Sequence, residues 1–302
     1  MNSLFDAPDD VFARGNKAGQ VTVDFSMAYA AIREILEADG QVNRQVAERA
    51  LLNWASDERM LNQFAGPTSK KFINRLRGIL EQEEETFYPV NDNLRASNGG
   101  AMKIGPVACF GKGDLEVTLE ICRIICFPTH GNSISMSAAC AVAAAVSGAL
   151  AGEDLTGIFR RAVYGAEKGE VFGKEGAVLA GPSVKKRLKL AISMGTEAKS
   201  LSDAMDRLRE YFDCSGMAAD SVPVAFGLMA AAQGKALTGT AAAANIGNDT
   251  DTMATIVGAV LGAYRGKVAF GSEIEEFLDK ANGYCLGELA EQIENTTATI
   301  KQ

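Results

Sequence analysis

Apolar residues recur at every third or fourth position along most of this chain, and alternation at every second position is almost absent. This spacing is typical of helices that bury one face, whereas strands would need the alternation. The pattern predicts helices over residues 25–36, 42–55, 68–83, 101–110, 115–127, 133–151, 156–168, 182–193, 201–211, 222–233, 236–245, 252–264 and 274–292. The prediction is an all-α fold, with one compact multi-helix domain over 21–292, a polar lead-in over 1–20 and a C-terminal tail over 293–302.

Glycine and proline set several of the expected helix ends. Pro128, Gly169 and Gly266 stand where a helical pattern stops, and both residue types commonly end helices. The helices over 133–151 and 252–264 carry no charge and are apolar almost all round. Both are therefore expected in the middle of the core.

Composition narrows the class of protein. The chain has 302 residues, of which 47% are hydrophobic, and its net charge is −8 without any basic run. Nucleic acid is therefore not an expected partner. No stretch is predicted as a membrane span, and the acidic N-terminus does not have the form of a signal peptide. The six cysteines form no CxxC pair and are interpreted as reduced thiols of a cytoplasmic protein.

The stretch from Gly247 to Thr252 gathers oxygen groups at the start of a predicted helix. Asp249 and Asp251 supply carboxylates, and Thr250 and Thr252 supply hydroxyls. Closely spaced carboxylates repel one another unless a cation lies between them, and oxygen ligands suit Mg²⁺, Mn²⁺ or Ca²⁺. The alternative is that these residues only cap the helix and interact with its dipole.

Three further loops carry polar groups that could serve a site. Thr22 and Asp24 offer two more oxygens, or ordinary caps, at another helix start. Gly99 and Gly100 leave backbone N–H groups unshielded before a helix, a form that can hold a phosphate, or they belong to a plain loop. His130 is the only histidine, which excludes a His-rich zinc site, and a lone histidine is more often structural than catalytic.

In their order along the chain, these four loops resemble the motifs of the ADP-ribosylglycohydrolase family. The family's motifs read Thr-Asp-Asp-Thr, Gly-Asn-Gly-Ala-Met-Arg, Thr-His and Gly-Gly-Asp-Thr-Asp-Thr. The matching segments here are Thr22–Phe25, Asn98–Lys103, Thr129–His130 and Gly247–Thr252. Asp220–Pro223 also resembles an Asp-containing helix start of the family, and the likeness covers about residues 15–285.

The resemblance implies an orthogonal helical bundle whose cleft holds two Mg²⁺ or Mn²⁺ ions. It also implies hydrolysis of the glycosidic bond between a ribose and its acceptor, in a small-molecule or ADP-ribosylated substrate. Carried over by motif, the metal ligands are Thr22, Asp24, Asp249, Asp251 and Thr252, of which the three aspartates are also catalytic. The substrate contacts implied in the same way are Asn98, Gly99, Gly100, Ala101 and His130.

The chain departs from the family pattern at two places. Val23 replaces the first Asp of the opening motif, and residues 1–20 are expected to lack the family's opening helix. The lost ligand predicts one tightly bound ion and a weak second one, and the missing helix predicts a homodimer that covers apolar surface. The leading interpretation is a metal-dependent hydrolase of a ribosyl bond. The alternative is a catalytically silent member that acts as a binding or structural protein.

Overall fold

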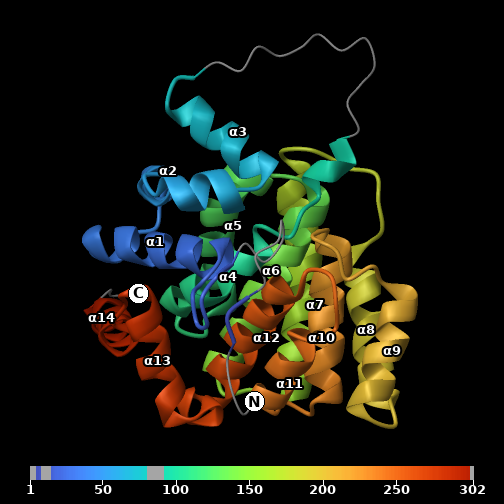
Figure 1. Cartoon of the computed structure of the whole chain (residues 1–302). Coiled ribbons are helices and arrows are strands. Elements are labelled where there is room, and N and C mark those ends of the chain that lie inside the picture. The colour runs from blue at the N-terminus through green and yellow to red at the C-terminus, as the bar shows by residue number, and fades with distance from the viewer. Residues whose placement is uncertain (1–4, 8–14, 80–91, 300–302) are drawn as a thin grey trace.

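The computed structural model describes residues 5–7, 15–79 and 92–299, and within them the fold is built of α-helices (Figure 1). Strand pairing in these residues is limited to one isolated bridge between Ser97 and Met217. The helices are α1 Val23–Glu37, α2 Arg44–Trp54, α3 Pro67–Leu76, α4 Ala101–Val107, α5 Leu115–His130, α6 Ser133–Leu150, α7 Leu155–Lys174, α8 Val184–Glu197, α9 Leu201–Tyr211, α10 Ala218–Ala231, α11 Ala236–Ala243, α12 Thr250–Arg265, α13 Ser272–Asn282 and α14 Leu286–Thr299. The all-α prediction is confirmed.

Helix α6 forms the centre of the core, as its apolar sequence predicts. Every residue from Ser133 to Ala149 is buried, and α7 packs along it closely. A Cβ added at Gly165, Gly169 or Gly173 would lie only 2.2–2.3 Å from a backbone carbonyl oxygen of α6. The predicted end of α7 at Gly169 is therefore wrong, because these glycines allow two helix backbones to approach.

Helix α12 does not lie in the middle of the core, contrary to prediction. Its buried residues, which include Met253, Ile256 and Val260, form one face, while the others are partly exposed. The second almost fully buried helix is instead α10. Helix α12 packs against α11, α10 and α6, and Gly266 ends it as predicted.

Three prolines, Pro106, Pro128 and Pro223, lie inside helices of the described part of the chain. Pro128 falls in the last turn of α5, which runs on to His130, so the predicted stop at Pro128 is wrong. Helix α10 begins at Ala218 and contains Pro223. A proline leaves the carbonyl four residues earlier without its helical partner, and here that carbonyl, on Ala219, accepts a hydrogen bond of 3.1 Å from the Arg187 guanidinium.

The C-terminal region also differs from the predicted single helix over 274–292. Gly283 adopts a left-handed φ of 67° and separates α13 from α14. Helix α14 continues to Thr299, beyond the predicted helix end at 292. Helix α3 ends at Leu76, and the predicted helix over 80–83 lies outside the described residues.

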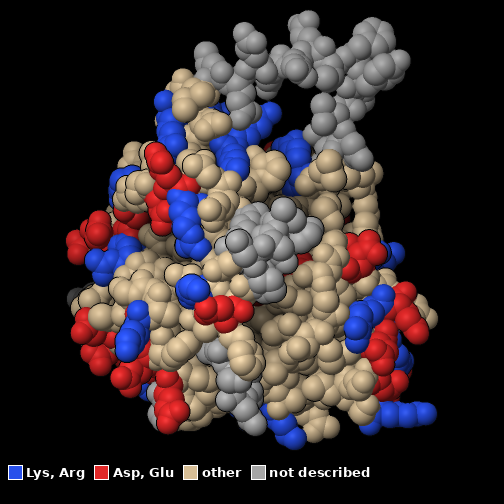
Figure 2. Space-filling view, viewed as in Figure 1, with Lys and Arg blue, Asp and Glu red and all other residues tan. Residues whose placement is uncertain are grey.

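Helix α6 is long and apolar enough to cross a membrane by length and composition, which the sequence-based expectation overlooked. In the structure, however, 94% of it is buried within the protein, where α7, α5, α4 and α12 pack against it. This burial identifies α6 as the core helix of the bundle. On the face in Figure 2, acidic and basic side chains are interspersed and form no basic stripe.

Candidate active site

The first motif lies at the start of α1, and its polar groups do not cap the helix. Thr22 occupies the N-cap position without any side-chain bond to the backbone of α1. Its hydroxyl instead donates to Asp24 Oδ2 over 2.8 Å. The Asp24 side chain is buried, with 1% exposure, and its Oδ1 has no hydrogen-bond partner. A buried, half-satisfied carboxylate is costly, so capping does not explain this pair.

In the motif Gly247–Thr252, the Asp249 carboxylate also points away from the helix that it precedes. Asp249 occupies the N-cap position of α12 but makes no capping bond. Its Oδ2 accepts a hydrogen bond of 2.6 Å from the Asn98 side-chain amide. The turn before it has positive φ at Gly247 (104°) and Asn248 (60°), and the Asp249 N–H is held by the Cys214 carbonyl at 3.0 Å. The loop is built to direct Asp249 toward Asn98.

The two motifs, more than 200 residues apart in sequence, share one electrostatic environment because α1 packs against α12. Burial first, and then the charge of Asp251, raises the pKa of Asp24 to about 7, while the hydroxyls of Thr22 and Thr252 oppose the rise. Burial likewise raises the pKa of Asp249 to about 6, against the hydrogen bond from Asn98 and the effect of the nearby Thr252 hydroxyl. The structure thus places Thr22, Asp24, Asp249, Asp251 and Thr252 near one another, and their role as metal ligands stays a prediction.

This cluster fits a hard divalent cation in its chemistry. It offers carboxylate and hydroxyl oxygens only, the ligands that Mg²⁺ and Mn²⁺ prefer, and the unpartnered Oδ1 of Asp24 needs a positive neighbour. Among the described residues, no group of three or more His, Cys, Asp and Glu side chains is placed so that it could hold an ion unaided. The hydroxyls of Thr22 and Thr252, or water, would have to complete the ligand set.

The loop with the two glycines lies inside the protein rather than on a surface. Asn98, Gly99, Gly100 and Ala101 are all buried. A Cβ on Gly99 would lie 2.6 Å from the His130 imidazole, so this glycine is required by the ring packed against it. Contact of this loop with substrate phosphate stays a prediction.

His130 is itself 2% exposed, and burial lowers its pKa to about 3. The imidazole is therefore neutral, and its ring packs against Gly99 of the loop. Any direct contact of His130 with substrate also stays a prediction.

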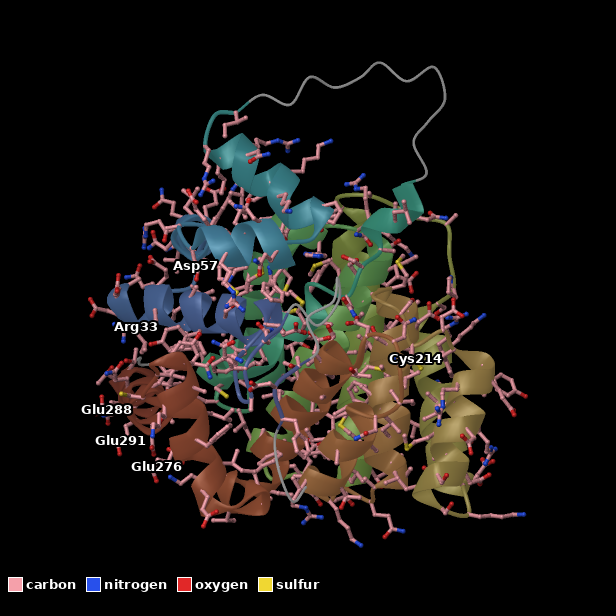
Figure 3. All side chains as sticks on the ribbon, viewed as in Figure 1. Arg33, Asp57, Cys214, Glu276, Glu288 and Glu291 are labelled. Atoms are coloured by element: carbon pink, nitrogen blue, oxygen red, sulfur yellow. The ribbon has the colours of Figure 1, made fainter. Side chains whose placement is uncertain are left out.

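The sequence analysis did not predict two structural supports of the site. Ser221, fully buried in α10, accepts a hydrogen bond of 2.9 Å from the Asn98 side-chain amide. The loop before α10 binds both partners of the central contact, because Gly216 O accepts from Asn98 N–H and Cys214 O (labelled in Figure 3) accepts from Asp249 N–H. No local signal predicts these backbone contacts. Asp220, part of a matched motif, pairs with Arg187.

A separate groove of about 320 Å³ lies beside α1. Arg33 and Asp57, labelled in Figure 3, line it together with Glu34 and the stacked rings of Tyr29 and Tyr284. None of the predicted site residues lines this groove. The carboxylate cluster and the open groove are therefore two separate sites beside α1.

Comparison with known proteins agrees with this arrangement of motifs. The sequence model of the ADP-ribosylglycohydrolase family matches residues 2–301. The chain belongs to this family. It is 26% identical over 265 residues to the uncharacterized protein YegU of Escherichia coli K12, an alignment that covers 87% of this chain and 77% of YegU. Membership supports a glycohydrolase-type function.

A solved ADP-ribosylglycohydrolase-related protein complex contains a chain with the same fold. The two align with a TM-score of 0.64 at 17% identity, over 93% of this chain and 83% of that one. The orthogonal helical bundle of the ADP-ribosylglycohydrolase family is therefore the fold of this chain.

The two departures from the family pattern concern Val23 and residues 1–20. Val23 packs against a small apolar cluster that includes Met27, Leu51 and Trp54, so this residue of the motif contributes to apolar packing. Residues 5–7 and 15–22 contain no helix, and residues 1–4 and 8–14 lie outside the described part of the chain.

Proposed function

We propose that this protein is a divalent-metal-dependent hydrolase of a ribosyl glycosidic bond, in an ADP-ribosylated or nucleoside-like substrate. The observation that carries the proposal is the cluster of the buried Asp24 and the half-buried Asp249, whose charges have no basic side-chain partner among the described residues. A buried carboxylate beside a half-buried one is unfavourable without a compensating cation. Family membership supports the glycosidic reaction.

Some residues of the site would hold the metal ion, and others would face the substrate. Asp24, with the hydroxyls of Thr22 and Thr252, would hold an Mg²⁺ or Mn²⁺ ion from the buried side. Such an ion would supply Lewis-acid activation of water and a charge that orients ribose hydroxyls. Asp251 is exposed on the solvent side, where it can accept a proton from the attacking water.

Asp249 has a positioning role as well as a charge. Its contact with the Asn98 amide fixes the carboxylate orientation. A fixed carboxylate close to the anomeric carbon stabilises the positive charge of an oxocarbenium-like transition state.

The test is an activity screen of ADP-ribosylated proteins, small ADP-ribosyl conjugates and nucleosides, with Mg²⁺ or Mn²⁺ present. We expect turnover that Asp249→Asn lowers by a factor of about 10² or more, the usual loss when an electrostatic group is removed. Asp206→Asn is the matched control, because its side chain is 66% exposed on α9.

The alternative function, a silent binding protein, rests on the apolar surroundings of Val23. Tight Mn²⁺ binding by calorimetry without turnover of any substrate would favour this alternative. Absence of Mn²⁺ and Mg²⁺ binding would contradict the metal dependence.

A further inference from the structure

A lysine is buried behind the Asn98 loop, where the proposed reaction has no use for it. Lys103, on α4, is 2% exposed, and it borders a small apolar cavity lined by Met27, Trp54 and Ile125. Burial lowers the pKa of its amine. Among the described residues, its side chain has one hydrogen-bond partner, the Thr129 hydroxyl at 3.2 Å. Burying an amine with so little compensation is expensive, so its placement needs a reason.

The hydrogen bonds that continue from this amine have a defined direction. The Lys103 amine donates to Thr129 Oγ1, whose own proton must go elsewhere. The candidate acceptors are His130 Nδ1 at 2.7 Å and the Cys126 carbonyl at 3.4 Å. The Thr129 hydroxyl can donate to either group, and the 2.7 Å contact fits donation to Nδ1. The neutral imidazole then carries its hydrogen on Nε2.

The other ring nitrogen of His130, Nε2, contacts the loop that carries Asn98. His130 Nε2 lies 3.2 Å from Ser97 Oγ and 3.4 Å from Thr68 Oγ1. The residue after Ser97 is Asn98, which donates to Asp249. An N–H at Nε2 therefore holds the segment that positions the central carboxylate contact.

We propose that Lys103 is a positioning residue, which acts through Thr129 to hold His130 as the neutral Nε2–H tautomer that fixes the Ser97–Asn98 segment. The tautomer is inferred from the contacts among Lys103, Thr129 and His130, and only the effect on turnover rests on the proposed function. The function of the lone imidazole is then to orient the loop, not to transfer protons.

A chain with one histidine allows a direct test. Protein labelled with ¹⁵N-histidine gives NMR signals from a single ring, and these distinguish a protonated from an unprotonated nitrogen. The wild type is expected to show a proton on Nε2 alone, unchanged between pH 8 and pH 5. Thr129→Val keeps the shape and the lysine but removes the relay, and Lys103→Met removes the amine. Both variants are expected to show mixed tautomers, and Lys103→Arg is expected to restore the wild-type signals.

Lys189→Met, at an exposed lysine of α8, is the matched control and should leave the ring signals unchanged. An Nδ1–H tautomer in the wild type, or a pure Nε2–H tautomer in Thr129→Val, would overturn the proposal. Thr129→Val keeps the test valid if Lys103→Met does not fold. Turnover in Thr129→Val is expected to fall about tenfold with Mn²⁺ affinity retained. Because the NMR result needs no substrate, its failure is distinguishable from failure of the proposed function.

Discussion

Neutralising Asp24 should make the ion-free protein more stable while abolishing its affinity for metal. The Asp24 carboxylate is buried with one unpartnered oxygen, so folding without an ion requires a charge to leave water. Asp24→Asn keeps the shape of the side chain and removes that charge. Its amide oxygen can still accept the hydrogen bond from the Thr22 hydroxyl.

The size of the effect follows from the pKa of Asp24, which is raised from 3.8 to about 7 in the fold. Between these values the folded protein keeps a proton that the unfolded chain has released, so this carboxyl lowers the free energy of unfolding as the pH rises through that window. At about 1.4 kcal/mol per tenfold change in acid constant, the cost is about 4 kcal/mol at pH 8 and about 2 kcal/mol at pH 5.

The Asn variant has its own cost, because its amide N–H₂ would stand where the carboxylate oxygen has no partner. An unsatisfied buried donor costs about 1–3 kcal/mol. The variant is therefore expected to be more stable than the wild type by about 2 kcal/mol at pH 8 and roughly equal in stability at pH 5.

Urea unfolding in the presence of a chelator, at several pH values from 5 to 8, measures this difference. The exposed Asp206→Asn variant, the control, should follow the wild type throughout. Saturating Mn²⁺ at pH 8 should stabilise the wild type, by about 2.7 kcal/mol at one hundred times the dissociation constant, and should leave Asp24→Asn unchanged. Parallel stability curves for the wild type and Asp24→Asn would refute the reasoning, since they would mean that Asp24 does not titrate in this window.

Four further outcomes are expected. Because the pKa of His130 is lowered to about 3, wild-type stability should fall relative to His130→Gln as the pH drops below about 6.5, by up to about 1.4 kcal/mol per pH unit in urea unfolding. Gly169→Ala should lower stability by about 1–3 kcal/mol through its clash with α6, whereas Gly258→Ala, whose Cβ would meet only one atom at 3.9 Å, should raise it or leave it unchanged. Calorimetry with Mn²⁺ should find one tight site in the wild type and a second in Val23→Asp; two tight sites in the wild type would contradict this. Light scattering should find a homodimer at micromolar concentration, and a monomer would disprove the predicted pairing.

The sequence alone determined the class of fold and the segments that carry chemistry. A spacing of three and four residues predicts helices wherever it is sustained, because a helix must bury one face. The uncharged run 133–151 was predicted as a core helix and is buried as α6, whereas the equally uncharged run 252–264 buries only one face of α12, so composition fixed the helices but not the burial of each. The polar loops stood out because carboxylates at apolar helix starts, such as Asp24 and Asp251, need a local explanation.

The sequence could not say whether those acids cap helices or face one another. Asp249 fits the capping rule by position, yet its carboxylate accepts from an amide 151 residues earlier in the chain. Local propensity cannot distinguish these two partners, because both satisfy the same oxygen. The choice depends on where α4, α10 and α12 place their ends.

Tertiary packing also decided the helix ends that the local rules predicted wrongly. Gly169 continues α7 because neighbouring α6 needs a residue without a side chain at that contact. Pro223 is tolerated inside α10 because Arg187, from α8, takes a carbonyl that the proline leaves free. In both cases a contact distant in sequence outweighs a local preference of about 1–3 kcal/mol. Such contacts exist only after the helices have packed, and for that reason they cannot be predicted from one segment at a time.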